Sequence, residues 1–524
     1  MALCSPQEFN TPTMQKQFET SDMNDCSFIL CIDEARTLLR MYSSDNVSQF
    51  VSFRNGARHA FGKCSFFAIL LDTTSHVSNF APAAKLKPSQ RTPDYAQLFP
   101  PIYAINTFDA FADPEDGSLP VFDATEISAI RLFKLGRPLW GAFLDNGASL
   151  RVTQDLARTK LGPADDDDFP LVLMAHRISI QASDYALADF LVSRCMRYIF
   201  YINPSRSLLW THYASEPILA FQAARAMRTP ARRLQALQRL VLAHSRGSVD
   251  LGDVGEMIAA IILLWTMDSF MEKSDFPSSV AVHRFLEALL GTEVAKKMHI
   301  SIQPNSSLVN IWENGKIYFN HVCRSLYHDS RSFPSTLLRQ AYRRGAAVFF
   351  PRNFAGADIG IPVALPGNKF TAILIQVKNR VDGGTQQSQR LLAQDSIRTA
   401  QRVISGLGDC MGLMMSLYRE REKGRAVVWP DKVARVSPRF IESQPSTTTD
   451  IFTALIAGLN HDIYPSVCPA GYQEREQIFE LLRVLRDHDP IHRLRECDDQ
   501  SLRMVNNIFF GVTEPHQDPM DLDP

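Results

Sequence analysis

Two neighbouring apolar segments carry polar residues that are poor choices for a protein core. Asp358 lies within the first segment, at 356–363, and Gln376 and Lys378 lie within the second, at 370–379. Short runs rich in Ile, Val and Leu predict β-strands, and the turn residues 366–368 between them predict a hairpin. A carboxylate can bind a hard cation such as Mg²⁺, and a lysine can bind phosphate. The pattern therefore indicates metal-assisted chemistry on a phosphate.

The length of the turn decides whether these side chains meet. A two-residue loop would place Asp358 opposite Ile375 and turn Gln376 to the other face. A three-residue loop closed by Asn368 in the left-handed region would place Asp358 opposite Gln376, and Asn tolerates that conformation. We therefore predict the three-residue loop. Because alternate residues of a strand share a face, Lys378 then lies beside them.

An Asp followed by Gln-x-Lys on a hairpin resembles the core of the restriction-endonuclease-like nucleases with a PD-(D/E)xK motif. The resemblance implies that Asp358 ligates Mg²⁺, that Gln376 is an auxiliary ligand, and that Lys378 orients the attacking water or stabilises charge on the phosphate. Phosphodiester cleavage uses such a metal to generate hydroxide and neutralise the transition state. Gln376 replaces the acid of the commonest pattern, so we expect weak metal affinity. The alternative is an ordinary Asp–Lys ion pair at a sheet edge.

A further carboxylate opens the most apolar stretch of the chain. Glu256 precedes the run 257–267, which at about eleven residues is too short to span a bilayer and predicts a buried helix. An unpaired Glu is costly to bury, although a helix N-terminus favours an acid. Because the nuclease core commonly adds a Glu from its first helix, the resemblance assigns Glu256 as a second metal ligand.

The N-terminal region shows a second pattern of strands that end in polar residues. One apolar run ends in Asp33-Glu34 and the next ends in Asp72-Thr73. P-loop ATPases use an Asp and a Glu at such positions to bind Mg²⁺ and activate water, and a polar residue to sense the γ-phosphate. Ligands of doubly wound sheets bind at strand ends. The alternative is two buried strands followed by turns.

The phosphate-binding loop of such an ATPase is missing. No G-x-x-x-x-G-K-[ST] motif occurs in the sequence. The nearest imitation, Gly62-Lys63-Cys64, lacks the hydroxyl and precedes a strand instead of following one. We therefore expect an incomplete ATPase-like domain that does not hydrolyse ATP by itself.

Arginines are concentrated at helical spacing in the region 225–246. A basic stripe of this kind could follow a nucleic-acid backbone. The alternative is a helix face that is merely exposed to solvent. The candidate nucleic-acid-binding residues are Arg225, Arg228, Arg232, Arg233 and Arg239.

Composition describes an ordinary globular protein. The chain has 524 residues, 45% of them hydrophobic and 21% charged, and a net charge of −1. No overall field attracts nucleic acid, so any basic surface must be local. The nine cysteines form no C-x-x-C pair, which indicates a reducing compartment and no zinc site. We expect an intracellular protein, nuclear or cytoplasmic, without a signal peptide or membrane association.

The order of the motifs resembles a larger group of proteins. Ser215-Glu216-Pro217, the block that contains Glu256, the segment Tyr318 to His321, and the Asp358 hairpin follow one another. This series resembles basidiomycete proteins of the Crinkler and retrotransposon-hot-spot type, in which an ATPase domain precedes a restriction-endonuclease-like domain. The resemblance implies a transposon-derived or effector-like protein that acts on DNA. The missing P-loop departs from this pattern and fits an eroded or truncated copy.

We predict an α/β protein with four parts. They are an incomplete P-loop ATPase-like domain at 1–160, a helical connecting region with the basic stripe at 161–245, a restriction-endonuclease-like domain with an α/β/α core at 246–472, and a helix with a disordered acidic tail at 473–524.

Two functional hypotheses compete. The first is a Mg²⁺-dependent nuclease acting on DNA, and the second is a catalytically inactive remnant that binds protein or nucleic acid. The first requires Glu256, Asp358, Gln376 and Lys378 to converge in one cleft that solvent can reach. A Lys378 that is sealed in an ion pair would favour the second.

Overall fold

Two compact units make up the chain. Unit 1 comprises Met1–Ile105 and Tyr185–His212, and unit 2 comprises Asn106–Asp184 and Tyr213–Pro524. The computed structural model describes residues 27–35, 37–40, 49–50, 52–53, 56–57, 65–72, 107–112, 128–202, 209–271, 275–302, 304, 306–325, 332–379, 386–418, 429–430, 451–469 and 471–487. The predicted acidic tail lies outside these residues.

The contacts divide the chain differently from the predicted boundaries at 160, 245 and 472. Most of the helical region predicted as a connection belongs to the same unit as the large sheet, and so does helix α17 (Glu474–Asp487). The reason is packing: α10 (Pro230–Ser245) lies against both α7 (Phe169–Ala175) and α17. The helices therefore form part of the body that carries the sheet.

Unit 1 contains the two N-terminal strands that the sequence predicts. Strands β1 (Ser27–Ile32) and β2 (Ser65–Leu70) are parallel neighbours. A short helix, α2 (Thr37–Arg40), follows β1. The rest of the unit that the structure describes includes α8 (Tyr185–Arg194) and the antiparallel pair β4 (Tyr198–Ile202) and β5 (Leu209–His212).

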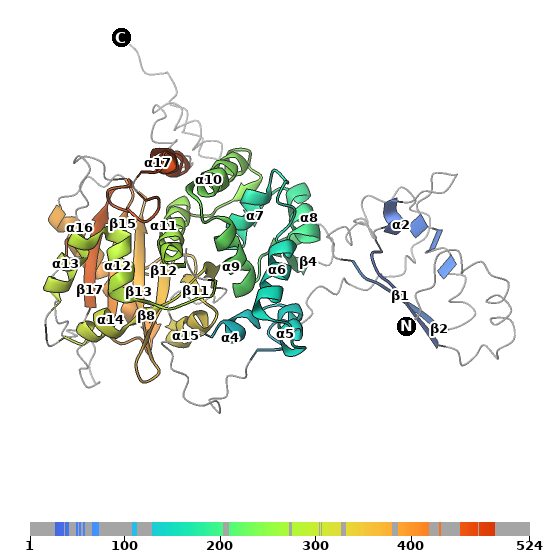
Figure 1. Ribbon diagram of the computed structural model, residues 1–524, viewed down its shortest axis with the longest axis horizontal. Helices are drawn as coiled ribbons and strands as arrows, with labels where there is room; N and C mark the ends of the chain where they lie inside the picture. The colour runs from blue at the N-terminus through green and yellow to red at the C-terminus, as the bar shows by residue number, and fades with distance from the viewer. Residues whose placement is uncertain are drawn as a thin grey trace, which may run out of the picture. The chain divides into compact units, whose positions relative to one another are not determined.

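Unit 2 is built on a mixed nine-stranded sheet (Figure 1). Along the sheet the order is β16-β17-β15-β13-β12-β11-β9, with β8 joining β12 and β7 joining β8. Strand β12 is antiparallel to both of its neighbours β11 and β13, whereas β13, β15 and β17 are parallel to one another. The bounds are β7 (Val280–Ala281), β8 (Lys316–Ile317), β9 (His321–Arg324), β11 (Ala346–Phe349), β12 (Ile359–Leu365), β13 (Lys369–Lys378), β15 (Cys410–Ser416), β16 (Trp429–Pro430) and β17 (Ile451–Ala457).

Helices cover both faces of this sheet (Figure 1). On one face, α15 (Ser335–Arg343) and α16 (Gln386–Val403) form an apolar core with β11, β13 and β15. Helix α16 also connects the parallel strands β13 and β15, as a crossover must. On the other face lie α11 (Val254–Met271), α12 (Val282–Leu290) and α14 (Leu308–Asn314). The observed class is mixed α/β.

Eight further helices complete the described part of unit 2, and α4, α6 and α7 of its N-terminal part pack on α9 or α10. Helix α9 begins with Pro217 and α10 with Pro230, each at the first helical position, where proline is preferred. The bounds not yet given are α4 (Ala129–Phe133), α5 (Pro138–Asp145), α6 (Leu150–Lys160), α9 (Pro217–Ala226) and α13 (Thr292–Ser301).

Helix α11 is the central helix of unit 2. Its sequence is apolar on all sides, as expected for a helix that is buried on all sides. By length and composition alone it would be able to cross a membrane, and it is the one helix of that kind among the described residues. In the structure 83% of it is buried, as core helices commonly are. The predicted buried helix is therefore confirmed.

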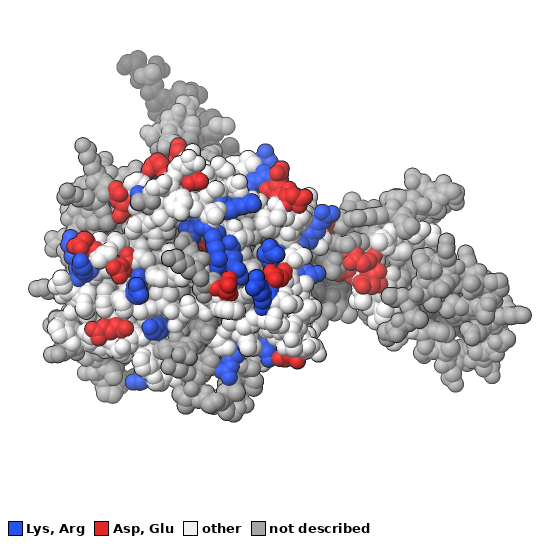
Figure 2. Space-filling view, viewed as in Figure 1, with Lys and Arg blue, Asp and Glu red and all other residues white. Residues whose placement is uncertain are grey.

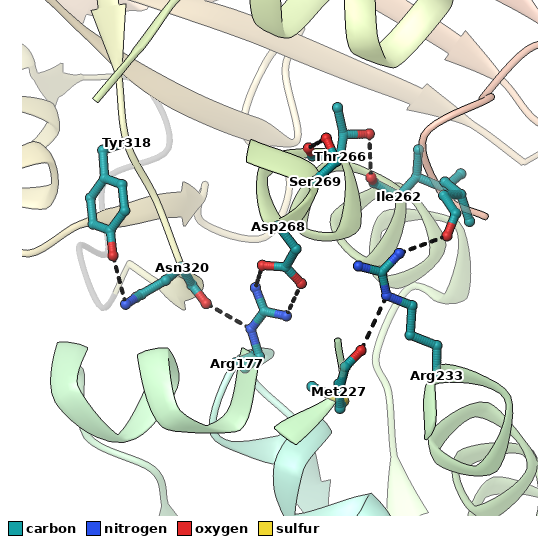
Figure 3. A network of polar contacts seen from close by, with 10 residues as sticks. Arg177, Met227, Arg233, Ile262, Thr266, Asp268, Ser269, Tyr318 and Asn320 are labelled. Carbon is teal, nitrogen blue, oxygen red and sulfur yellow. Dashed lines mark hydrogen bonds and ion pairs between the residues drawn. The ribbon is translucent and has the colours of Figure 1, made fainter. Parts of the chain in front are cut away.

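A network of buried polar contacts ties this helix to the sheet and to the helical part (Figure 3). Arg177, which follows α7, donates two hydrogen bonds to the Asp268 carboxylate of α11, at 2.6 and 2.8 Å. Its Nε donates to the backbone oxygen of Asn320, one residue before β9. Arg177 is 1% exposed and Asp268 is 4% exposed. The pair fixes three elements against one another.

Candidate metal and phosphate site

The hairpin of β12 and β13 has the predicted register. Residues 366–368 form the turn between the last paired residues, Leu365 and Lys369, and Asn368 adopts a positive φ of 58°. The pairing of Ile359 with Ile375 continues to Asp358 and Gln376 at the open end of the hairpin. A three-residue turn with a left-handed Asn therefore brings the acid and the amide face to face.

Asp358 and Gln376 are in direct contact. Gln376 Nε2 donates a hydrogen bond to Asp358 Oδ2 at 2.5 Å, and the backbone N–H of Val377 donates to the same oxygen at 2.6 Å. These bonds hold the carboxylate in one orientation and leave its other oxygen available. Because the amide nitrogen of Gln376 faces Asp358, its amide oxygen is the atom that can bind a cation.

The first turn of α11 comes close to the same strand ends. A β-carbon placed on Gly255 would lie 2.8 Å from Asn379 Cβ, which is closer than such atoms approach. Only glycine allows this contact between the helix and the end of β13. Asp253 caps the helix, since its Oδ1 accepts hydrogen bonds from the N–H groups of Gly255 and Glu256 at 2.9 and 3.3 Å.

The negative charge of Asp358 lies close enough to affect the ionisation of Glu256. The pKa of Glu256 is raised to about 8, first by burial and then by the negative charges of Asp358 and Asp253, although Arg324 lowers it. Burial also raises the pKa of Asp358 to about 6, although the N–H of Val377 lowers it. Neighbouring carboxylates in a half-buried place are favourable for a divalent cation, which would relieve their repulsion.

Lys378 completes the predicted set. Its positive charge lowers the pKa of Asp358, which places it near that carboxylate. Among the described residues, its ammonium group has no hydrogen-bond or ion-pair partner, and the residue is partly exposed. Lys378 is therefore not sealed in an ion pair. We call Asp253, Glu256, Asp358, Gln376 and Lys378 the candidate site.

The donor atoms of the candidate site suit Mg²⁺. They are carboxylate and amide oxygens, and Mg²⁺ takes one or two carboxylates and retains several waters. Within the described part of the chain, no three His, Cys, Asp or Glu residues are grouped closely enough to enclose a metal. A site made by Glu256, Asp358 and the Gln376 oxygen needs only two such residues. It would bind the cation from one side and leave room for water and phosphate.

Gly255→Ala tests the close approach of helix and strand. Alanine favours an exposed helix by about 1 kcal/mol over glycine, but here its methyl group would push α11 away from Asn379. We expect a lower melting temperature and weaker stabilisation by Mn²⁺. The control is Gly408→Ala, because a β-carbon at Gly408 meets no atom within 4 Å. A Gly255→Ala protein that is more stable and binds Mn²⁺ normally would contradict the proposed geometry.

The raised pKa values predict that metal binding strengthens with pH. The pKa of Glu256 is about 8 and that of Asp358 is about 6, so both carboxylates lose protons between pH 5.5 and about 8.5. Without metal, these groups bind protons more tightly in the folded state, and their contribution to stability is lost as pH rises through about 6 and then about 8. Because Mg²⁺ binds the ionised carboxylates, it should oppose this loss of stability as pH rises. Melting curves in Mg²⁺ and in EDTA across this range should diverge with rising pH, and a constant difference would contradict the prediction.

The predicted nucleotide residues of unit 1 lie at the ends of two adjacent strands. Asp33 and Glu34 follow β1, and Asp72 lies two residues after β2. Because the strands are parallel and in register, these ends share one edge. The Asp33 side chain accepts a hydrogen bond from the N–H of Glu34 at 2.9 Å, and Glu34 has a positive φ of 51°. Thr73 lies outside the described residues.

The predicted basic stripe is not a stripe. Helix α9 ends at Ala226, and Thr229 caps the start of α10 at Pro230. Arg225 therefore lies on α9, and Arg228 lies between the two helices. Arg233 is 1% exposed, and its guanidinium donates to the backbone oxygens of Met227 and Val467. It is a core residue, and the prediction that it binds nucleic acid is wrong.

The other predicted arginines mostly contact their own chain. Arg225 forms an ion pair with Asp275 at 2.9 Å, and Arg228 donates to the backbone oxygen of Met271. Arg239 binds Asp167, and Arg232 is exposed and donates to the neighbouring Gln235. Nucleic-acid binding by these residues remains a prediction, but they do not form one continuous surface.

Sequence reasoning missed Asp253 and two arginines. Asp253 and Glu256 form a D-x-x-E pattern, a variant of the capping box, so the sequence alone can predict that Asp253 caps this helix. Arg324 approaches Glu256, with Nη2 3.8 Å from Oε2, and Arg352 also lowers the pKa of Glu256. Arg324 ends β9 and Arg352 follows β11, and nothing in their local sequence indicates that the two strand ends meet α11.

Two segments of the chain are similar to known families. Residues 7–105 match a family described as Domain of unknown function (DUF8735), and residues 170–401 match one described as Domain of unknown function (DUF8736). No curated protein and no solved structure matches the chain. The second matched range contains every residue of the candidate site.

Proposed function

We propose that unit 2 is a Mg²⁺-dependent nuclease-like protein that acts on DNA phosphodiester bonds. The observation that carries the proposal is the meeting of three separate segments at one place. Glu256 comes from a helix, Asp358 from the start of β12, and Gln376 and Lys378 from the end of β13. The resemblance to PD-(D/E)xK nucleases implies this set of roles. The resemblance to Crinkler and retrotransposon-hot-spot proteins implies a transposon-derived or effector-like origin.

Each side chain has a task that its surroundings allow. Asp358 and Glu256 would hold the metal, and Gln376 orients Asp358 through its amide N–H. A bound Mg²⁺ would activate water and neutralise charge on the phosphate. Lys378, whose ammonium has no partner among the described residues, can orient water or bind a phosphate oxygen. We propose that the polar strand ends of unit 1 belong to an ATPase-like remnant that does not hydrolyse ATP.

Local basic surface supports a polyanionic substrate. Figure 2 shows Lys and Arg side chains, with several Asp and Glu side chains between them, across the middle of one face of unit 2 in the region of α9 and α11. The chain as a whole has a net charge of −1, so such a surface must be local if the protein is to bind DNA. We propose that the Lys and Arg side chains of this face supply the attraction for DNA that overall charge does not.

A binding module without activity is the second candidate. It is favoured by Gln376, because an amide at this position removes one negative charge from the site. Such a protein would keep the hairpin and the helix contact and bind DNA or a protein without cutting it.

Plasmid cleavage decides between the two. Purified protein is incubated with supercoiled DNA in Mg²⁺, in Mn²⁺ and in EDTA, together with the Asp358→Ala and Lys378→Ala variants. We expect metal-dependent nicking or linearisation that both variants lose. A folded native protein that leaves the plasmid intact in both metals would reject the nuclease, and the inactive remnant would then be the better account.

A further inference from the structure

Arg324 lies in the same row of the sheet as the candidate site. It is the last residue of β9 and pairs with Phe349 of β11 in the parallel register. Phe349 in turn pairs with Ile359, the residue after Asp358. The fold thus places the arginine two strands away from the metal-binding acid, at the same end of the sheet.

Two contacts fix where the guanidinium lies. Its central carbon is 5.0 Å from the centroid of the Phe349 ring, in a cation–π contact. Its Nη2 is 3.8 Å from Glu256 Oε2, which is too long for a hydrogen bond. The aromatic ring therefore orients the group, and the nearest carboxylate does not occupy its donors.

The donors of Arg324 are available to a ligand. Within the described part of the chain, its guanidinium makes no hydrogen bond, and the side chain is 27% exposed. An arginine presents its N–H groups as a planar fork that matches a phosphate in two-point contact. Lys378 provides a second available cation from β13. The two cations come from opposite sides of the carboxylates that would bind metal.

We propose that Arg324 binds the non-bridging oxygens of the phosphate that is cleaved. The inference rests on the proposed nuclease and adds a substrate-binding residue to it. A metal bound by Glu256 would neutralise the one carboxylate that Arg324 approaches. The guanidinium would then bind a different anion, held beside the metal. A phosphodiester supplies that anion.

The test measures cleavage and binding with matched variants. Arg324→Gln removes the charge, Arg324→Lys keeps it without the fork, and Arg398→Gln is the control, since Arg398 has a similar exposure of 26% and pairs with Asp395 on α16. Kinetics on a short DNA duplex in Mg²⁺ give KM and kcat. Fluorescence anisotropy in Ca²⁺ gives affinity and its dependence on salt concentration.

Arg324→Gln should raise KM about 10- to 100-fold, as loss of a charge-assisted hydrogen bond does. The salt dependence of DNA binding by Arg324→Gln should fall by about one phosphate contact. Arg324→Lys should recover part of the affinity. The control Arg398→Gln should match the native protein. If Arg324→Gln unfolds, the lysine variant carries the comparison, because it retains the charge over Phe349.

Three outcomes separate the two proposals. Native cleavage with an unchanged KM in Arg324→Gln overturns the role of Arg324 and leaves the nuclease standing. A folded native protein without cleavage rejects the nuclease, and binding in Ca²⁺ then decides the role of Arg324. In that case, weaker binding and a smaller salt dependence in Arg324→Gln support phosphate contact, whereas equal binding by both proteins, including none, overturns it.

Discussion

Asp358→Asn should lower the rate of metal-dependent cleavage by at least about 100-fold, the scale expected when one preorganised charge is removed from an active site. The asparagine oxygen can still accept the hydrogen bonds from Val377 and Gln376, so the hairpin is preserved. What the variant loses is a negatively charged metal ligand. The rate is measured on supercoiled plasmid at saturating Mn²⁺.

The same variant should not be less stable than the native protein. Burial raises the pKa of Asp358 to about 6, so its ionised form is disfavoured in the folded state at pH 8 without metal. A neutral amide avoids that cost, and the melting temperature in EDTA should stay equal or rise. Loss of activity together with preserved stability is the signature of a functional acid.

Asp395→Asn is the matched control for this experiment. Asp395 lies on α16, is 72% exposed and pairs with Arg398, so its loss should change neither cleavage nor melting temperature. A metal-dependent activity that survives Asp358→Asn would mean that the nuclease site lies elsewhere. An activity lost only because the variant unfolds would assign Asp358 a structural role.

Local rules were sufficient to predict the hairpin and its register. Turn length, the left-handed tolerance of Asn368 and the alternation of strand faces together place Asp358 opposite Gln376, and the structure has this arrangement. These rules act over a few residues, so sequence alone contains the information. The buried helix around Glu256 is predictable for the same reason, because its apolar composition leaves no face for solvent.

Contacts between distant segments were not readable in this way. Arg324 and Glu256 approach each other only because β9 ends and α11 begins at the same edge of the sheet. The burial of Arg233 depends on Trp265, Met227 and Val467, which come from three other places in the chain. Helical spacing shows that arginines share a face but does not show whether that face meets solvent or another helix.

The contacts divide the chain at other places than the predicted domain boundaries, for a related reason. A stretch of helices between two sheets was interpreted as a connection, but α10 packs against α7 and α17, and α9 packs against α6. The elements on which a helix packs decide to which domain it belongs. Helical periodicity shows that a helix has an apolar face but not which element covers that face. The break at Thr229-Pro230 was readable as a cap followed by a first-turn proline, and it would have divided the basic stripe before the structure did.

Breaking the buried Arg177–Asp268 pair should produce the largest loss of stability. Asp268→Ala leaves a guanidinium that is 1% exposed without its carboxylate, and such an uncompensated buried charge costs about 3–5 kcal/mol. The pair joins the end of α7, helix α11 and the segment before β9, so the loss should affect the whole of unit 2. Urea denaturation followed by tryptophan fluorescence measures it, since Trp265 lies on α11.

Two comparisons show whether the loss of stability comes from the unpaired buried charge of Arg177 or from the loss of an ion pair as such. Replacing both members, as Arg177→Met with Asp268→Leu, removes both charges and should recover most of the stability. Asp155→Ala breaks an exposed pair with Arg158, whose members are 69% and 63% exposed, and should cost less than about 1 kcal/mol. Because Asp268 and Glu256 share α11, cleavage by the double variant also tests whether the pair positions the candidate site. Native-like cleavage would assign the pair to stability alone, whereas an Asp268→Ala protein as stable as the Asp155→Ala control would contradict the buried pair.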